Sequence, residues 1–264
     1  MIETILQMIP LHNIFVEALC GAASLALNKP SAKVEVINDL NKDIYDFFIT
    51  IRDNYDKLYH YLLNTPYHRG LYYELKHKWR QGWRPMDQIE KVATWFFLQD
   101  SSFSGTFGAG FSTARKDKNV ASEFASRVDL LYKVRDRLRN IYIDCRDYQE
   151  VIEYYDCKDM FTYLDPPYWI DAANNYYKAG QNFDHYRLAE VLNRITGKAI
   201  ISYYPHPELV KIYPPPKWNF KSIKTVKHSF KADSNAQGEE RYKPEAEELL
   251  ICNFEPLPLF ANIN

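Results

Sequence analysis

Apolar positions along this chain follow one pattern at both ends and another in the middle. In residues 1–12 they recur at helical spacing. Short β-favouring runs follow at 13–17 and 33–38, with a helix start near Leu25 between them. After residue 139, β-favouring runs alternate with helical segments again. Strands that alternate with helices predict an α/β fold built on a parallel sheet.

The middle of the chain lacks strand patterns. From about residue 56 to residue 138 helical segments follow one another, including a long one at 123–139, and turn signals such as Arg84-Pro85 separate them. This span is too long for a single crossover between two strands. We therefore predict two domains, a core made of residues 1–55 and 139–264 and a helical insertion made of residues 56–138.

Composition and charge are those of an ordinary globular protein, and they limit how it could meet nucleic acid. Of the 264 residues, 46% are hydrophobic and 25% are charged. The 33 Lys and Arg residues are balanced by 34 Asp and Glu residues, for a net charge of −1. Contact with a nucleic acid must therefore come from local basic patches rather than from the field of the whole protein.

Cysteine and histidine usage points away from disulfides and metals. The cysteines at positions 20, 145, 157 and 252 have no Cys-x-x-Cys spacing, and the seven histidines are scattered. We expect reduced thiols and no metal site. The N-terminus lacks the layout of a signal peptide, and no apolar run approaches the length of a membrane span. The expectation is a metal-free, cytoplasmic protein.

One predicted strand ends abruptly. The apolar run at 160–164 stops at Asp165, which two prolines and Tyr168 follow. Proline has no N–H to donate to a strand ladder, so the strand must end at Asp165. Ligands of open α/β sheets bind beyond the carboxyl ends of the strands, which predicts an acid, a rigid carbonyl and an aromatic ring at such a site. The alternative is a proline-stiffened turn, with Asp165 as a turn residue and Tyr168 as a cover of the core.

A second group of residues suggests a nucleotide-like ligand. Small residues from Gly21 to Ser24 separate the run at 13–17 from the next helix, where they would let a ligand approach the backbone. Asp39 follows the next strand, 18 residues after Gly21, near the spacing of about 20 at which an acid meets ribose hydroxyls. The alternatives are that Asp39 is only a helix N-cap and Glu17 only a charge at a strand end.

The insertion combines basic and aromatic side chains. Between residues 67 and 84 they interleave, as in surfaces that contact phosphates and stack on bases, although a solvated helix explains much of the pattern too. A loop of small residues and phenylalanines at 101–111 could enter a DNA groove or act as a lid. The predicted DNA-binding residues are Arg80, Arg84, Ser102, Phe103, Ser104, Arg115 and Lys116.

Together these segments resemble the Dam-type family of DNA adenine-N6 methyltransferases, including its phage and mobile-element members. The similarity covers almost the whole chain, with a cofactor motif at 15–24, a second cofactor strand at 36–41, the helical insertion and the Asp-Pro-Pro-Tyr motif at 165–168. The resemblance implies a Rossmann-like α/β fold for a methyltransferase dependent on S-adenosylmethionine. Its sheet would have seven mostly parallel strands and a last antiparallel hairpin, and the insertion would be a helical target-recognition subdomain.

The resemblance also implies a reaction. A methyl group would pass directly from S-adenosylmethionine to the exocyclic amine of an adenine flipped out of double-stranded DNA, without a metal. Asp165 and the carbonyl of Pro166 would accept the hydrogens of that amine. Pro167 would help to hold the carbonyl rigid, and Tyr168 would stack on the base. A monomer or weak dimer is expected. The implied cofactor-binding residues are Glu17, Leu19, Gly21, Ser24, Asp39, Leu40, Asp147 and Asp165.

The sequence departs from the family pattern at two places. Members usually open with an aromatic-Pro-Gly-Gly-Lys segment, and this sequence starts just beyond it. Leu19 stands where phenylalanine is usual, and Ala22 and Ala23 stand where glycine is common, so their methyl groups narrow the approach to the cofactor. The alternatives are a weak or inactive DNA-binding homologue and a cytosine-N4 methyltransferase. A nicotinamide-dependent oxidoreductase is disfavoured, because Gly-x-Gly-x-x-Gly is absent.

Overall fold

Strands and helices alternate at both ends of the chain, and helices fill the middle. The computed structural model describes residues 2–114, 119–169, 183–226 and 245–256. The strands are β1 (Ile14–Leu19), β2 (Val34–Asn38), β3 (Tyr142–Asp144), β4 (Met160–Leu164), β5 (Lys198–Tyr203), β6 (Asn219–Val226) and β7 (Glu245–Cys252). The α-helices are α1 (Ile2–Met8), α2 (Ser24–Asn28), α3 (Lys42–Leu63), α4 (Arg69–Arg80), α5 (Gln88–Asp100), α6 (Val120–Asp129), α7 (Leu131–Leu138), α8 (Tyr148–Tyr155), α9 (His185–Arg194) and α10 (Leu209–Ile212), and η1 (Phe103–Gly105) is a 3₁₀ turn.

A seven-stranded sheet forms the centre of the first compact unit, which consists of residues 1–40 and 144–264. The strand order is β3-β2-β1-β4-β5-β7-β6. β1 pairs in parallel with β2 and β4, and β4 pairs in parallel with β5. β7 is antiparallel to both β5 and β6. The predicted seven-stranded, mostly parallel α/β sheet is confirmed.

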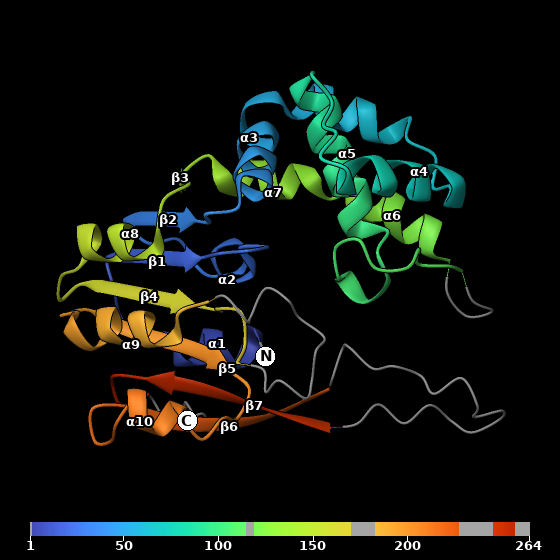
Figure 1. Cartoon of the computed structure of the whole chain (residues 1–264). Coiled ribbons are helices and arrows are strands. Elements are labelled where there is room, and N and C mark those ends of the chain that lie inside the picture. Colours follow the sequence, from blue (N-terminus) through green and yellow to red (C-terminus); the bar gives the residue numbers. More distant parts are fainter. Residues whose placement is uncertain (1, 115–118, 170–182, 227–244, 257–264) are drawn as a thin grey trace, which may run out of the picture. The chain divides into compact units, whose positions relative to one another are not determined.

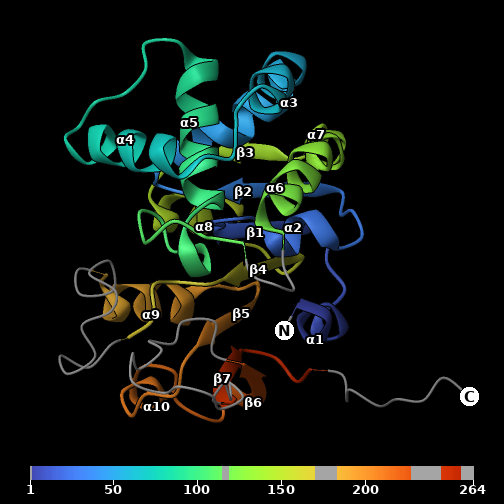
Figure 2. The ribbon, with the colours of Figure 1, turned by 90° about the vertical axis from the view of Figure 1, so that its right-hand side faces the viewer.

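Helices cover both faces of this sheet. α8 and α9 lie on one face, and α1 and α2 lie on the other, as the two views of Figures 1 and 2 show. Apolar side chains of α8 and α9, such as Val151 and Leu188, belong to one buried cluster with Val16 of β1 and Leu164 of β4. All five residues of β4 are buried, as expected for a central strand covered on both faces.

The register of the central strands determines which segments meet at the carboxyl edge of the sheet. Glu17 of β1 pairs with Tyr163 of β4, and Leu19 pairs with Leu164. Parallel strands have their carboxyl ends at the same edge. The turn that leaves β1 and the Asp165 that follows β4 therefore start side by side.

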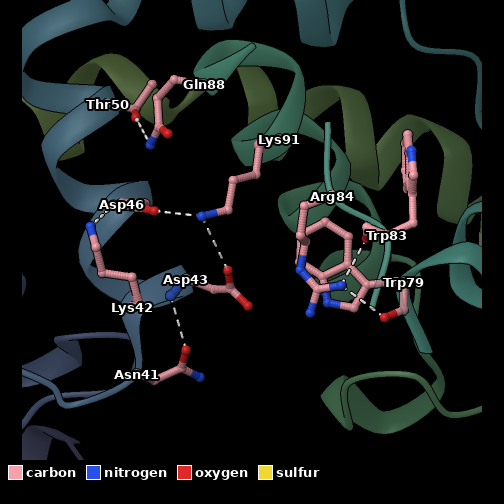
Figure 3. A network of polar contacts seen from close by, with 10 residues as sticks. All are labelled: Asn41, Lys42, Asp43, Asp46, Thr50, Trp79, Trp83, Arg84, Gln88 and Lys91. Atoms are coloured by element: carbon pink, nitrogen blue, oxygen red, sulfur yellow. Dashed lines mark hydrogen bonds and ion pairs between the residues drawn. The ribbon is translucent and has the colours of Figure 1, made fainter. Parts of the chain in front are cut away.

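The second compact unit consists of residues 41–143 and is helical. Helix α3 packs against α5 and α7. Lys91 of α5 forms ion pairs with two acids of α3, at 2.7 Å from Asp46 and 3.7 Å from Asp43, as Figure 3 shows. Burial opposes ionisation of Asp46, but hydrogen bonds from Lys42 and Lys91 outweigh it and lower the pKa of this carboxyl.

The borders of this unit differ from the predicted ones. The compact units divide after Leu40 and after Ile143, whereas the prediction placed the borders after residues 55 and 138. A border after residue 55 would cut α3, which continues to Leu63. The long helix predicted at 123–139 is wrong, because Leu130 separates α6 from α7 there, without a glycine or proline to signal the break. Among the residues described, no helix is both long and apolar enough to cross a membrane.

Candidate active site

The turn that leaves β1 holds two residues with left-handed backbone. Gly21 has φ +48° and Ala23 has φ +50°. A Cβ atom on Gly21 would meet no atom within 4 Å, so glycine is needed there for its backbone conformation, and the space beside it is open. Ala23 is fully buried and has no such freedom, so its conformation is a local strain of the kind that concentrates at functional sites.

Asp39 is joined to this turn. The backbone N–H of Gly21 donates to a carboxylate oxygen of Asp39 at 2.9 Å. Asp39 is not the N-cap of α3, because Asn41 occupies that position and its side chain accepts from the N–H of Asp43. Leu40, the next residue, has 64% of its surface exposed. The acid chosen by its spacing therefore lies at the glycine turn, beside an exposed apolar side chain.

Glu17 lies beneath the same turn. It is buried, and one of its carboxyl oxygens accepts from the N–H of Ala26 in α2 at 2.8 Å. Burial raises the pKa of Glu17 to about 8, and the charge of Asp165 adds to the rise. Backbone hydrogen bonds from Ala26 and Leu25 lower this pKa but do not outweigh burial. Glu17 therefore occupies amides at the start of α2 and supports the turn from inside.

Asp147 begins helix α8 and forms an ion pair. One of its carboxylate oxygens accepts from the N–H of Gln149 at 2.9 Å, as an N-cap does. Arg187 of α9 donates to both oxygens, at 2.8 Å and 3.0 Å. A carboxylate has about four acceptor positions, so these three bonds leave room for one further donor.

Asp165 stands at the carboxyl end of β4, directly before the prolines. It keeps an exposed surface, whereas Pro166 behind it is buried. Removal of water by the surrounding protein raises the pKa of Asp165 to about 6, the neighbouring hydroxyl of Tyr168 lowers this pKa, and the charge of Glu248 raises it. At neutral pH the carboxylate form still predominates, and it can accept hydrogen bonds.

Tyr168 is held by its hydroxyl group and by its ring. The hydroxyl donates to Glu248 of β7 and lies 3.1 Å from the hydroxyl of Ser202 in β5. Its ring meets that of Tyr204 edge-on at 4.4 Å between centroids. The tyrosine is half-buried, so one part of it is fixed against the sheet and another part remains accessible.

The residue after the motif is fixed as well. Trp169 stacks between two imidazoles, with ring centroids 4.5 Å from His185 and 4.7 Å from His206. His185 is anchored in turn, because its Nδ1 lies 2.9 Å from the hydroxyl of Tyr203. The backbone on both sides of the two prolines is thus held, by β4 before them and by this aromatic stack after them.

In the helical unit, side chains of α4 hold the loop at 101–112. Arg80 donates to the carbonyl oxygen of Gly108 at 2.8 Å, and Lys76 donates to that of Ala109 at 2.6 Å. The hydroxyl of Ser102 is buried, donates to the carbonyl of Leu98 and accepts from the N–H of Gly108. These placements give Arg80 and Ser102 a part in shaping the loop.

The other predicted DNA-binding residues lie in different surroundings. The guanidinium group of Arg84 stacks on Trp79 at 3.8 Å from the ring centroid and donates to the carbonyls of Trp79 and Trp83, as Figure 3 shows. Phe103 is 45% exposed, as a side chain that meets another molecule would be. The side chain of Ser104, and the whole of Arg115 and Lys116, lie outside the described residues.

The family assignment follows from comparison with known proteins. The sequence model of the D12 class N6 adenine-specific DNA methyltransferases matches residues 1–244. This chain belongs to that family. It is also 23% identical over 174 residues to the Type II methyltransferase M.MjaIII of Methanocaldococcus jannaschii, a match that covers 58% of this chain and 58% of the relative.

Membership of the D12 class family confirms the predicted resemblance to DNA adenine-N6 methyltransferases. Methyltransferases of this kind use S-adenosylmethionine in general. The residues at the β1 turn fit such a group: the space at Gly21 is open, and Asp39 brings a carboxylate beside it. In the described ranges, no cluster of three His, Cys, Asp or Glu side chains is arranged to hold a metal ion.

Three residues of the site were not found from the sequence. Arg187, Ser202 and Glu248 contact predicted site residues, but each belongs to a helix or strand far along the chain. Glu248 follows Glu245 and Glu247 and precedes an apolar run, so its sequence context gave no signal that this acid rather than its neighbours would be buried. Its partner depends on the antiparallel pairing of β7 with β5, which local sequence patterns do not reveal.

Proposed function

We propose that this chain is a site-specific DNA adenine-N6 methyltransferase. It transfers a methyl group from S-adenosylmethionine to the exocyclic amine of an adenine flipped out of double-stranded DNA. The observation that carries this proposal is the Asp165-Pro166-Pro167-Tyr168 segment at the carboxyl end of β4, next to the β1 turn that Asp39 binds. Family membership supports the same class of substrate.

The chemistry begins with a poor nucleophile. The lone pair of an adenine amine is delocalised into the ring, so the amine must be polarised before it attacks. The carboxylate of Asp165 and the carbonyl of Pro166 accept its two hydrogens and direct the lone pair toward the methyl donor. The proline rings restrict this backbone, which provides the acceptors in advance of the reaction. Tyr168 offers the exposed part of its ring to the flipped base.

The cofactor, when bound, supplies a methyl group activated on a sulfonium. The carboxylate of Asp39 is suited to accept hydrogen bonds from two ribose hydroxyls. Leu40 supplies an apolar surface beside that carboxylate, and Gly21 lets a ligand approach the backbone. Asp147, with one acceptor position left, is suited to an amine of the cofactor's adenine.

The helical unit is proposed to recognise the target sequence. Its exposed Phe103 can insert between bases, and its aromatic and basic side chains can contact the DNA around the flipped nucleotide. Predicted phosphate contacts from Arg115 and Lys116 belong to the same proposal. A cytoplasmic location and action as a monomer or weak dimer remain part of the same proposal.

Analysis of nucleosides tests the proposal. Plasmid DNA from a strain without DNA methyltransferases is incubated with the protein and S-adenosylmethionine, digested to nucleosides and separated by chromatography with mass detection. We expect N6-methyldeoxyadenosine from the wild type and none from Asp165→Ala. Asp159→Ala is the matched control, because Asp159 is exposed and precedes the other end of β4.

The outcomes separate the enzyme classes. Detection of N4-methyldeoxycytidine instead would identify cytosine, and not adenine, as the target base. Absence of any methylated base, while the protein remains folded and DNA is in excess, would overturn the proposed activity.

A further inference from the structure

The hydroxyl of Tyr168 has more acceptors around it than hydrogens to give. Glu248 accepts from it, the hydroxyl of Ser202 lies 3.1 Å away, and the carboxylate of Asp165 is a further acceptor nearby. A tyrosine hydroxyl carries a single hydrogen. Only one of the two carboxylates can receive that hydrogen at a time.

Glu248 is placed to receive it. Its side chain extends from β7 into the sheet interior, and only 4% of the residue is exposed. The same oxygen, Oε1, accepts from Tyr168 and, at 3.0 Å, from Ser202. A buried carboxylate is costly unless donors surround it, so Glu248 stabilises an arrangement in which both hydroxyls point toward it.

Asp165 gains from this arrangement. If the hydroxyl of Tyr168 donated to Asp165, it would occupy an acceptor position of the carboxylate that has to meet the amine. While it donates to Glu248, the acceptor positions of Asp165 remain available to the substrate. The tyrosine ring is held in one orientation at the same time, because its hydroxyl is anchored to β5 and β7.

We propose that Glu248 is a positioning residue of the methyl transfer. It takes the hydroxyl hydrogen of Tyr168, fixes the tyrosine ring against the sheet, and keeps the carboxylate of Asp165 for the amine of the adenine. This inference rests on the proposed function, since it assigns a role within that reaction. Glu248 acts through Tyr168 and does not touch the reacting atoms.

Four variants separate this role from simple packing. Glu248→Ala removes the acceptor, and Glu248→Gln keeps an oxygen acceptor while it removes the charge. Tyr168→Phe removes the hydroxyl, and the double variant Glu248→Ala/Tyr168→Phe removes both partners. Glu247→Ala is the matched control, because Glu247 is the neighbouring acid on β7, is exposed, and bonds to Ser222 instead.

The first measurement is kcat with unmethylated plasmid DNA and labelled S-adenosylmethionine, per cofactor-binding site counted by calorimetry. In Glu248→Ala the hydroxyl of Tyr168 turns to Asp165, so kcat should fall by roughly tenfold to a hundredfold, the scale of a mispositioned catalytic group. Affinity for S-adenosylmethionine should remain unchanged. Glu248→Gln should keep most of the activity, and Tyr168→Phe introduced into Glu248→Ala should raise kcat again, because the competing hydroxyl is gone.

The pH profile of kcat gives a second, independent measurement. Among the residues described, the titratable groups around Asp165 are Glu17 from β1, Tyr163 from β4, Tyr203 from β5, Tyr168 and Glu248. Loss of the charge in Glu248→Gln should move the acidic limb of the profile to lower pH. A role of Glu248 in packing alone would leave the acidic limb unshifted.

The outcomes are distinguishable. An active wild type with an unchanged kcat per site in Glu248→Ala would overturn the role of Glu248 and leave the proposed function intact. A double variant no better than Glu248→Ala, with an unshifted profile in Glu248→Gln, would also overturn it. A wild type that methylates no base would overturn the proposed function, and the role of Glu248 with it.

Discussion

The acids at the carboxyl edge of the sheet and the bases of the helical unit were selected from the same sequence, and the structure treats them differently. Asp39 follows β2 and Asp165 follows β4, the two strands that flank β1, so both acids stand at the carboxyl edge of the sheet. Arg80 and Arg84 instead donate to carbonyl oxygens of their own unit. Position in the fold supports a function more strongly than residue type does.

The difference has a physical reason. A side chain at the end of a parallel strand faces the crevice where backbone pairing stops, so other parts of the chain leave it room. A long cationic side chain on the surface reaches several neighbours and contacts whichever acceptor or aromatic ring is near. Arg84 does so by stacking on Trp79, and Arg80 does so by reaching across to Gly108.

Replacement of Asp165 by asparagine is expected to have the largest effect, and it tests the role of the acids at the carboxyl edge of the sheet. The amide keeps one acceptor oxygen but loses the charge, so it polarises the amine poorly. We expect kcat to fall by at least about a hundredfold, the scale for loss of one electrostatic contact in a transition state. Single-turnover kinetics with excess enzyme measure this step. An activity within threefold of wild type, as for the control Asp159→Ala, would contradict the role.

Acidification offers a milder way to remove the same charge. The raised pKa of Asp165, about 6, means that its carboxylate form is present above that pH and is lost as the pH falls through it. Below pH 6 we expect kcat to decline by about tenfold per pH unit. Rates between pH 5 and pH 8, with S-adenosylmethionine at saturation, measure the decline. A flat profile over this range would show that methyl transfer does not require the deprotonated carboxylate of Asp165.

Asp39→Ala should weaken the cofactor site without removing the catalytic one. Loss of hydrogen bonds to a charged group costs about 1.5–3 kcal/mol, which corresponds to roughly tenfold to a hundredfold in the dissociation constant for S-adenosylmethionine. Titration calorimetry gives this constant. Asp156→Ala is a suitable control, because Asp156 accepts from backbone N–H groups of Thr196 and Gly197 elsewhere in the same unit. Equal affinities for Asp39→Ala and wild type would remove Asp39 from the site.

The smallest effect is expected for Arg80→Ala. If Arg80 mainly holds the loop, the variant loses about 1 kcal/mol of stability and leaves the salt dependence of DNA binding unchanged. If it contacts a phosphate, the slope of log Kd against log salt falls by about 1. Filter binding at several salt concentrations distinguishes the two, with Lys57→Ala, another cation of the helical unit, as the control. A reduced slope would show that Arg80 contacts DNA in spite of its bond to Gly108, so a base of the helical unit would then have a functional role like that proposed for the acids.

Much of the fold was predictable, because its signals are local. Runs of apolar residues mark the strands, and proline marks the end of β4. The spacing from Gly21 to Asp39 predicted a ligand contact for Asp39, and the structure brings its carboxylate to the N–H of Gly21, since one strand–turn–helix–strand unit has few ways to fold. Where strands return after a long interval, as β7 does beside β5, no local signal states the partner. Glu248 was missed for that reason, and Arg187 because a helix surface does not reveal which acid it faces.

The pairing of β1 with β4 also determines when this protein can fold. Thr162 bonds to the carbonyl of Val16, 146 residues earlier in the chain, and the entire helical unit is translated between them. At a synthesis rate of about 5–20 residues per second, β1 waits roughly 7–30 s on the ribosome for its partner strand. The helical unit, which is continuous in sequence, can fold during that wait. The nascent chain would therefore carry a folded helical unit while one edge of β1 is still unpaired.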